Sequence, residues 1–172
     1  TEFVFVLTAL PTLKLQDTEV RKRKRYVSEL RAIRQFVLDT QKLPNVRVYG
    51  FDLEKFTDDL RLYKDPTHYH IAVNDYIVDR IAGDEGLLTA ANVDDYVVAL
   101  DAKVSAYRLP DKWNPLHQPL VEAGYLSMEA ARLLLKADTD YSDAEITRIS
   151  LADRKLPECL QKAASDQRIQ KQ

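Results

Sequence analysis

Two apolar, strand-like runs separated by a helical pattern fill the first fifty or so residues, and this order constrains the fold more than any other feature. Phe3 to Leu10 is nearly all apolar, β-branched or aromatic, and Pro11 ends the run. Such a continuous run is typical of a strand that is covered on both faces, as in a parallel sheet. A second short strand is expected at residues 46–51.

Between these strands the sequence predicts one long helix. Asp17 or Thr18 can cap it, and it would run to about Gln41, before Pro44. Its apolar residues recur at helical spacing and form one stripe: Val20, Val27, Leu30, Ile33 and Val37. A strand, a helix and a strand in this order make a βαβ unit with a right-handed crossover. The fold class is therefore α/β.

Further helical patterns follow the βαβ unit. Apolar residues spaced by four predict a helix around residues 73–81, with Gly83 placed to end it. Another helix is expected over residues 93–107, capped by Thr89 or Asn92.

The character of the chain changes at Pro110. Three prolines punctuate residues 110–119, which is typical of a rigid linker or a surface-wrapping arm. We therefore divide the chain into an α/β part, residues 1–109, and a Pro-rich linker with an α-helical C-terminal extension, residues 110–172. In the extension, helices are expected at residues 127–137, after a Ser-x-x-Glu capping box at Ser142, and after Pro157.

Composition excludes several classes of protein. The chain has 172 residues but only 4 glycines, and these are not clustered as a dinucleotide fingerprint, a phosphate-binding loop or a Gly-x-Ser-x-Gly elbow requires. Cys159 is the single cysteine, which excludes an internal disulfide and a Cys-rich zinc site. The 25 basic and 27 acidic residues give a net charge of −2, so we expect no nucleic-acid partner.

The chain also has no segment that reads as a membrane anchor or a leader. No apolar run approaches the roughly 20 residues that a transmembrane helix needs. The opening apolar run lacks a basic flank and a small-residue cleavage site, so we expect no signal peptide. Because Thr1 is not Met and leads directly into a strand, we expect processing or further sequence before it.

Asp65-Pro66-Thr67-His68 is the segment that predicts a chemical mechanism. A carboxylate three residues before a histidine can turn back and accept a hydrogen bond from Nδ1–H, which leaves Nε2 as a general base for a hydroxyl nucleophile. Pro66 restricts Asp65 to extended conformations and stiffens the turn. The alternative is that Asp65 merely caps a turn and His68 is an ordinary surface histidine.

The surroundings of this segment resemble a known family. A strand at residues 45–49, an acidic loop, the run Tyr63 to Tyr69 and then a helix are similar to the C-terminal part of the SGNH hydrolases, also called GDSL-type esterases and acyltransferases. The likeness spans residues 3–109 and is closest to bacterial envelope-associated members. In that family an Asp-x-x-His block supplies two members of a Ser-His-Asp triad. Carried over by position, His68 would be the base and Asp65 its orienting partner.

The resemblance implies a flavodoxin-like, three-layer α/β unit that is partial here. It implies an ester hydrolase or O-acyltransferase acting on acyl esters of a carbohydrate or cell-envelope polymer, in the cell envelope or otherwise outside the cytoplasm. It implies no metal or organic cofactor. The departure lies in the nucleophile. The family's Gly-Asp-Ser-like block and its oxyanion Gly and Asn are absent, so the serine is expected outside this chain.

Two other candidate sites are weaker. His68 and His70 with Asp65 and Asp75 offer nitrogen and oxygen donors, but Asp65 cannot easily orient His68 and bind a metal too, so no metal is expected. The basic run at residues 21–25 could contact phosphate, but five consecutive residues cannot share one helix face. A solvated face is the favoured interpretation.

A second function class stays open. In it the βαβ unit is a non-catalytic scaffold, and residues 110–172 dock a protein partner. The position of the His68 ring separates the two hypotheses. A ring held by Asp65 in a cleft at the carboxyl ends of the strands favours the enzyme, and a ring that points into solvent favours the interaction module.

Overall fold

The computed structural model describes residues 1–108, 126–136 and 141–152, so the Pro-rich linker and the helix expected after Pro157 lie outside the described residues. The two expected strands are present as β1 (Phe3–Leu7) and β2 (Val46–Gly50). They pair in parallel, which confirms the βαβ unit. β1 is shorter than predicted because the chain turns away from β2 after Leu7, and the Leu10 N–H then points to the Asp52 carboxylate at 3.4 Å.

The single helix predicted between these strands is wrong. It forms two helices, α1 (Thr12–Arg21) and α2 (Arg23–Thr40), with a break at Lys22, where φ is −138° and ψ is 48°. The bend lets α1 reach the end of the chain's later helix, since the Gln16 side chain donates to the Tyr107 carbonyl at 2.7 Å.

Two small β-structures extend the pattern that the sequence predicted. β5 (Leu87–Leu88) pairs antiparallel with β2, so the sheet has the order β1-β2-β5 and is mixed rather than purely parallel. β3 (Tyr63–Asp65) and β4 (His68–Tyr69) form a separate antiparallel hairpin after two short 3₁₀ turns, Lys55–Asp58 and Leu60–Leu62. The chain is therefore a mixed α/β protein.

The remaining described helices agree with the prediction to within about two residues: α3 (Ile71–Ala82), α4 (Val93–Ala106), α6 (Met128–Lys136) and α7 (Asp143–Ala152). Gly83 ends α3, as expected. The predicted capping box is present, because the Ser142 N–H donates to the Glu145 carboxylate at 3.0 Å and the Glu145 N–H to the Ser142 hydroxyl at 3.3 Å. Within the described ranges, no helix combines the length and the apolarity needed to cross a bilayer.

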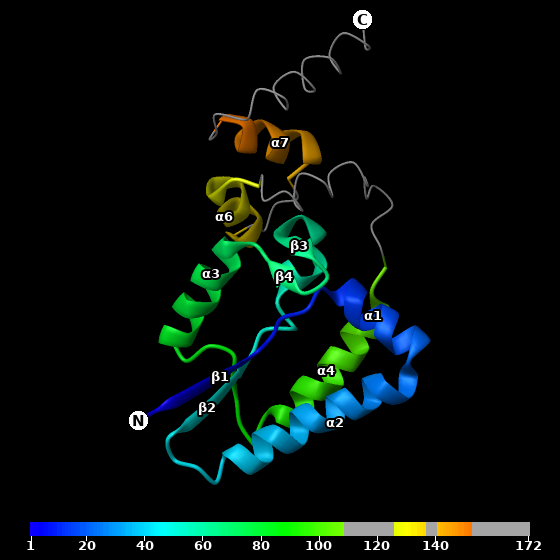
Figure 1. Ribbon diagram of the computed structural model, residues 1–172, viewed down its shortest axis with the longest axis vertical. Coiled ribbons are helices and arrows are strands. Elements are labelled where there is room, and N and C mark those ends of the chain that lie inside the picture. The colour runs from blue at the N-terminus through cyan, green and yellow to red at the C-terminus, as the bar shows by residue number, and fades with distance from the viewer. Residues whose placement is uncertain (109–125, 137–140, 153–172) are drawn as a thin grey trace, which may run out of the picture.

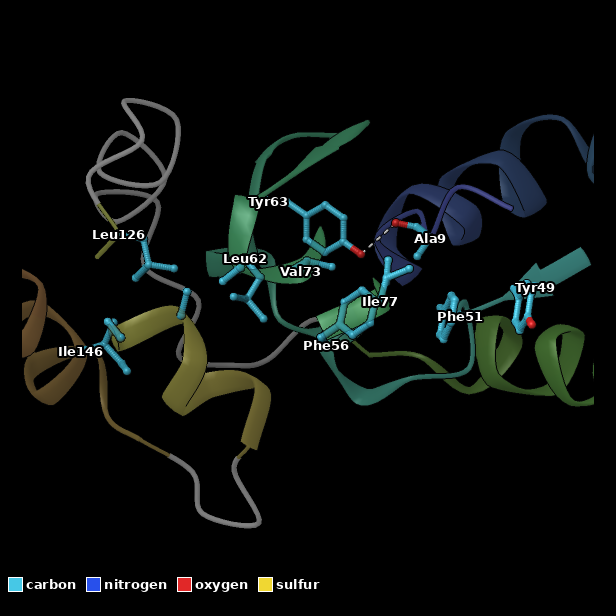
Figure 2. Close-up of a cluster of buried hydrophobic side chains, with 13 residues drawn as sticks. Ala9, Tyr49, Phe51, Phe56, Leu62, Tyr63, Val73, Ile77, Leu126 and Ile146 are labelled. Carbon is cyan, nitrogen blue, oxygen red and sulfur yellow. Dashed lines mark hydrogen bonds between the residues drawn. The ribbon is translucent and has the colours of Figure 1, made fainter. Parts of the chain in front are cut away.

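The core has two clusters, one on each face of β2. Val48 packs with Leu88 and the buried side chains of α2 and α4, while Tyr49 belongs to the cluster that includes α3. Figure 1 shows α2 and α4 on one side of the β1–β2 pair and α3 on the other. The α3 cluster continues through the hairpin to α6 and to Ile146 of α7, so the described helices of the extension share a core with the hairpin (Figure 2).

Candidate functional site

Asp65 and His68 face each other across the two-residue turn of the β3–β4 hairpin. β3 ends at Asp65 and β4 begins at His68, and these two residues are paired in the hairpin. His68 Nδ1 lies 2.7 Å from Asp65 Oδ2 and 2.9 Å from Oδ1. The expected hydrogen bond between carboxylate and imidazole is therefore made within the hairpin itself.

The turn holds the Asp65 carboxylate in place from several directions. Its Oδ1 accepts hydrogen bonds from the Thr67 N–H at 2.8 Å, the Thr67 hydroxyl at 2.8 Å and the His68 N–H at 3.0 Å. The two bonds from Thr67, followed by those from His68, hold the pKa of Asp65 well below its usual range. Asp65 is therefore a carboxylate at neutral pH and can only accept hydrogen bonds.

This geometry sets the tautomer of His68. Because an ionised carboxylate accepts, Nδ1 carries the proton and Nε2 of the neutral ring presents its lone pair. The His68 side chain is 73% exposed, so Nε2 is accessible to an incoming hydroxyl group. A ring with this arrangement is competent as a general base. Its exposure to solvent, however, is the outcome that favours the interaction module.

Tyr63 fixes where the hairpin lies relative to the sheet. Its hydroxyl donates to the Ala9 carbonyl at 3.0 Å, just beyond the carboxyl end of β1 (Figure 2). Its ring packs edge-on against Tyr69 in the partner strand, with centroids 6.3 Å apart. Burial raises the pKa of Tyr63 far above the ordinary value, which keeps the hydroxyl a donor. The hairpin is thus held at the carboxyl ends of the strands, where α/β proteins commonly bind ligands.

His70 has a structural role. Its Nδ1 accepts from the Ala72 N–H at 3.1 Å and caps α3, while its Nε2 lies 2.9 Å from the Leu126 carbonyl. Both ring nitrogens of His70 thus have hydrogen-bond partners. The described residues hold no group of three or more side chains suited to a metal ion.

The described serines lie elsewhere. Ser127 is 2% exposed, and its hydroxyl accepts from the Ala130 N–H at 3.1 Å, while Ser142 belongs to the capping box. The others are Ser28 in α2, Ser105 in α4 and Ser150 in α7. None of these described serines makes a hydrogen bond with His68, so the structure brings together the base and its partner but not a nucleophile.

A buried polar network at the end of β2 was missed by the sequence analysis, which placed Asp52 in an irregular acidic loop. Asp52 is 5% exposed and its Oδ2 accepts from the Tyr96 hydroxyl at 2.6 Å. Lys103 donates to the Asp52 carbonyl at 3.2 Å and to the Thr57 hydroxyl at 2.6 Å. The available signal was the position of Asp52, directly after an apolar strand.

This network joins elements rather than presenting a reactive group. It links the end of β2, the 3₁₀ turn at residues 55–58 and α4, and Thr57 is fully buried. Burial raises the pKa of Asp52, against the opposing effect of the Tyr96 hydrogen bond. The network therefore supports the sheet end against which the hairpin packs.

The basic run at residues 21–25 is a solvated face. Arg21 pairs with Asp17 at 2.6 Å, Arg25 pairs with Glu29 at 2.7 Å, and Arg23 pairs with Glu19. Each acid lies four residues away, on the same helix or across the break at Lys22. These exposed ion pairs neutralise the arginine charges locally and leave little net positive charge to attract an anionic partner.

Comparison of the chain with protein-family models, curated protein sequences and solved structures found no match. The likeness to SGNH hydrolases therefore stays a prediction that rests on the order of elements and on the Asp65-x-x-His68 segment.

Proposed function

We propose that the protein is part of an SGNH-type ester hydrolase or O-acyltransferase, with His68 as general base and Asp65 as its orienting carboxylate. The observation that carries the proposal is the 2.7 Å contact between His68 Nδ1 and Asp65 Oδ2, in a hairpin that Tyr63 anchors to Ala9 just beyond β1. A flavodoxin-like, three-layer sheet and a location in the cell envelope belong to the same proposal.

The chemistry follows from the tautomer. Nε2 of His68 takes the proton of a serine hydroxyl as its oxygen attacks the acyl carbon, and the C–O bond of the ester then breaks as the imidazolium returns that proton to the leaving alcohol. Asp65 stabilises the imidazolium while it exists. A water or a sugar hydroxyl then takes the acyl group from the serine by the same proton transfers in reverse.

The serine and the oxyanion donors come from polypeptide outside the described residues. The substrate class is an acyl ester on a carbohydrate or envelope polymer.

A serine-reactive fluorophosphonate tests the proposal on the protein isolated, with everything bound to it, from cells that make it. We expect labelling of the wild type and a loss of at least about 100-fold in labelling rate in His68→Ala, in line with the contribution of a general base. Val78→Ala on the exposed face of α3 is the matched control and should label normally. Absence of wild-type labelling, or full labelling of His68→Ala, would overturn the catalytic assignment and favour the interaction module.

The tautomer can be measured without any nucleophile. In ¹⁵N NMR at high pH, neutral His68 should carry its proton on Nδ1, and Asp65→Ala should return the ring to the Nε2–H form that histidine ordinarily prefers. His70 serves as the internal control, because its proton lies on Nε2 when Nδ1 accepts from Ala72. If His68 were Nε2–H in the wild type, the base could not act as described.

A further inference from the structure

The ring of His68 has few partners that hold it. Its side chain is exposed, so packing contributes little to its orientation. Within the part of the chain that the structure describes, the ring nitrogens have two hydrogen-bond partners. These are the Asp65 carboxylate and the Thr67 hydroxyl, whose oxygen lies 3.1 Å from Nδ1. Because a base must be held in one direction to act efficiently, both partners bear on the orientation of the ring.

The Thr67 hydroxyl lies within hydrogen-bond distance of both members of the pair. Its oxygen is 2.8 Å from Asp65 Oδ1 and 3.1 Å from His68 Nδ1. Because the Asp65 carboxylate is ionised and lies 2.7 Å from Nδ1, Nδ1 carries a proton, and the hydroxyl proton points to Oδ1. The lone pairs of the hydroxyl oxygen then face Nδ1–H. Asp65, Thr67 and His68 thus form a closed triangle of hydrogen bonds.

The turn gives the hydroxyl this position. The Thr67 N–H donates to the same Asp65 Oδ1 at 2.8 Å, as in an Asx turn, so the N–H and the hydroxyl of Thr67 converge on one oxygen atom. Threonine is branched at Cβ and has few side-chain rotamers, which restricts where its hydroxyl can lie. The Thr67 N–H and then its hydroxyl are the main causes that keep the pKa of Asp65 below its usual range.

We propose that the Thr67 hydroxyl positions the general base: it fixes the Asp65 carboxylate through Oδ1 and holds the Nδ1–H side of the His68 ring, so that Nε2 is presented in one direction. The catalytic role of the pair rests on the proposed function. Thr67 does not itself attack the substrate, because its oxygen faces Nδ1, which is protonated and cannot accept the hydroxyl proton. Thr67 is therefore a positioning residue that acts through Asp65 and His68.

Thr67→Val tests the hydroxyl apart from the rest of the turn, because valine keeps the branched shape and the backbone N–H. In NMR of the 172-residue chain, the ratio of the two neutral His68 tautomers should move about three- to tenfold toward the Nε2–H form. The carboxyl carbon of Asp65 should begin to titrate at higher pH, since the carboxylate loses one donor. Thr67→Ser keeps a hydroxyl and should restore most of both properties.

Fluorophosphonate labelling of the protein isolated with everything bound to it measures the consequence for the base. The labelling rate should fall about three- to tenfold in Thr67→Val, which is less than in His68→Ala, and should recover in Thr67→Ser. Thr18→Val is the matched control, because it removes a hydroxyl that donates to the Lys14 carbonyl within α1. It should change neither the labelling rate nor the His68 tautomer. An unchanged denaturant midpoint of Thr67→Val shows that folding is intact.

The outcomes separate this inference from the proposed function. A changed tautomer ratio in Thr67→Val without any labelling of the wild type would uphold the positioning of the ring and refute the enzyme. Labelling of Thr67→Val at the wild-type rate, or an unchanged tautomer ratio, would overturn the inference. A covalent adduct on Thr67 of the wild type would also overturn it, because Thr67 would then be the nucleophile rather than a positioning residue.

Discussion

β1 and β2 lie side by side in one sheet, but the more apolar of the two strands is the less buried. β1 is entirely apolar, and its first four residues are exposed. β2 contains an arginine and a glycine, and its last three residues, Val48 to Gly50, are buried. The composition of a strand therefore indicates whether the strand is suited to burial. Its actual burial depends on the neighbours present at both edges and on both faces.

β2 has those neighbours. It pairs with β1 on one edge and β5 on the other, and a core cluster lies on each of its faces. Its one charge stays at the surface, since Arg47 pairs with Glu2 at 2.7 Å and Asp84 at 2.8 Å. Substitutions in the central strand β2 and in the edge strand β1 should therefore differ in their effect on the free energy of unfolding.

The largest effect is expected at Gly50. A Cβ there would lie 2.7 Å from the Tyr96 hydroxyl and 2.9 Å from Leu88 Cδ1, and Tyr96 cannot move away without breaking its hydrogen bond to Asp52. We expect Gly50→Ala to lower the free energy of unfolding by about 3 kcal/mol. Urea denaturation of the 172-residue chain measures it. Gly83→Ala is the control, because the nearest atom to its Cβ lies at 3.5 Å; equal effects at the two glycines would contradict the packing argument.

The next effect compares the two strands directly. Val48 is 3% exposed and Val4 is 49% exposed, and they differ in burial but not in chemistry. Truncation to alanine should cost about 2 kcal/mol at Val48 and less than about 0.5 kcal/mol at Val4 in the chain alone. Similar losses for both variants, measured by urea denaturation, would mean that the edge of β1 is covered in the chain alone.

The fold was predictable where one segment carries the whole signal. The apolar run of β1, the helical stripe of α4 and the capping box at Ser142 are local patterns, and each was placed correctly. The break at Lys22 and the two-residue strand β5 were not predicted, because they depend on packing between distant segments. The break between α1 and α2, for instance, accompanies the contact between Gln16 of α1 and Tyr107 at the end of α4.

The candidate site shows the same division. The Asp65–His68 contact was predictable because a short local segment and its proline determine it. The anchoring of the hairpin by Tyr63 on Ala9 was not, since 54 residues separate the partners. The prediction that β1 is covered on both faces is wrong, since Phe3 to Val6 are exposed. An apolar run indicates that a strand is suited to burial and does not indicate that its neighbours are present.

The smallest effect is a change in pH dependence at the buried end of β2. Burial raises the pKa of Asp52, so the folded protein retains a proton that the unfolded chain releases. The stability is then fully present below the unfolded pKa of about 3.9 and is lost as the pH rises through the folded pKa. Asp52→Asn should remove this loss, so the difference in unfolding free energy between wild type and variant should fall as the pH rises from about 4. The asparagine side chain has nearly the same shape and keeps one acceptor oxygen, so the effect stays below those at Gly50 and Val48.

Asp94, on the exposed surface, should give a pH dependence of stability with the opposite sign. Its hydrogen bond from Arg34 lowers its pKa, so its contribution is present above the unfolded pKa and is lost as the pH falls through the folded pKa. The difference between wild type and Asp94→Asn should therefore rise with pH where that for Asp52→Asn falls. Urea denaturation at a series of pH values measures both slopes. If both differences in unfolding free energy rose with pH, Asp52 would not be desolvated in solution. That result would contradict the burial of the carboxyl end of β2.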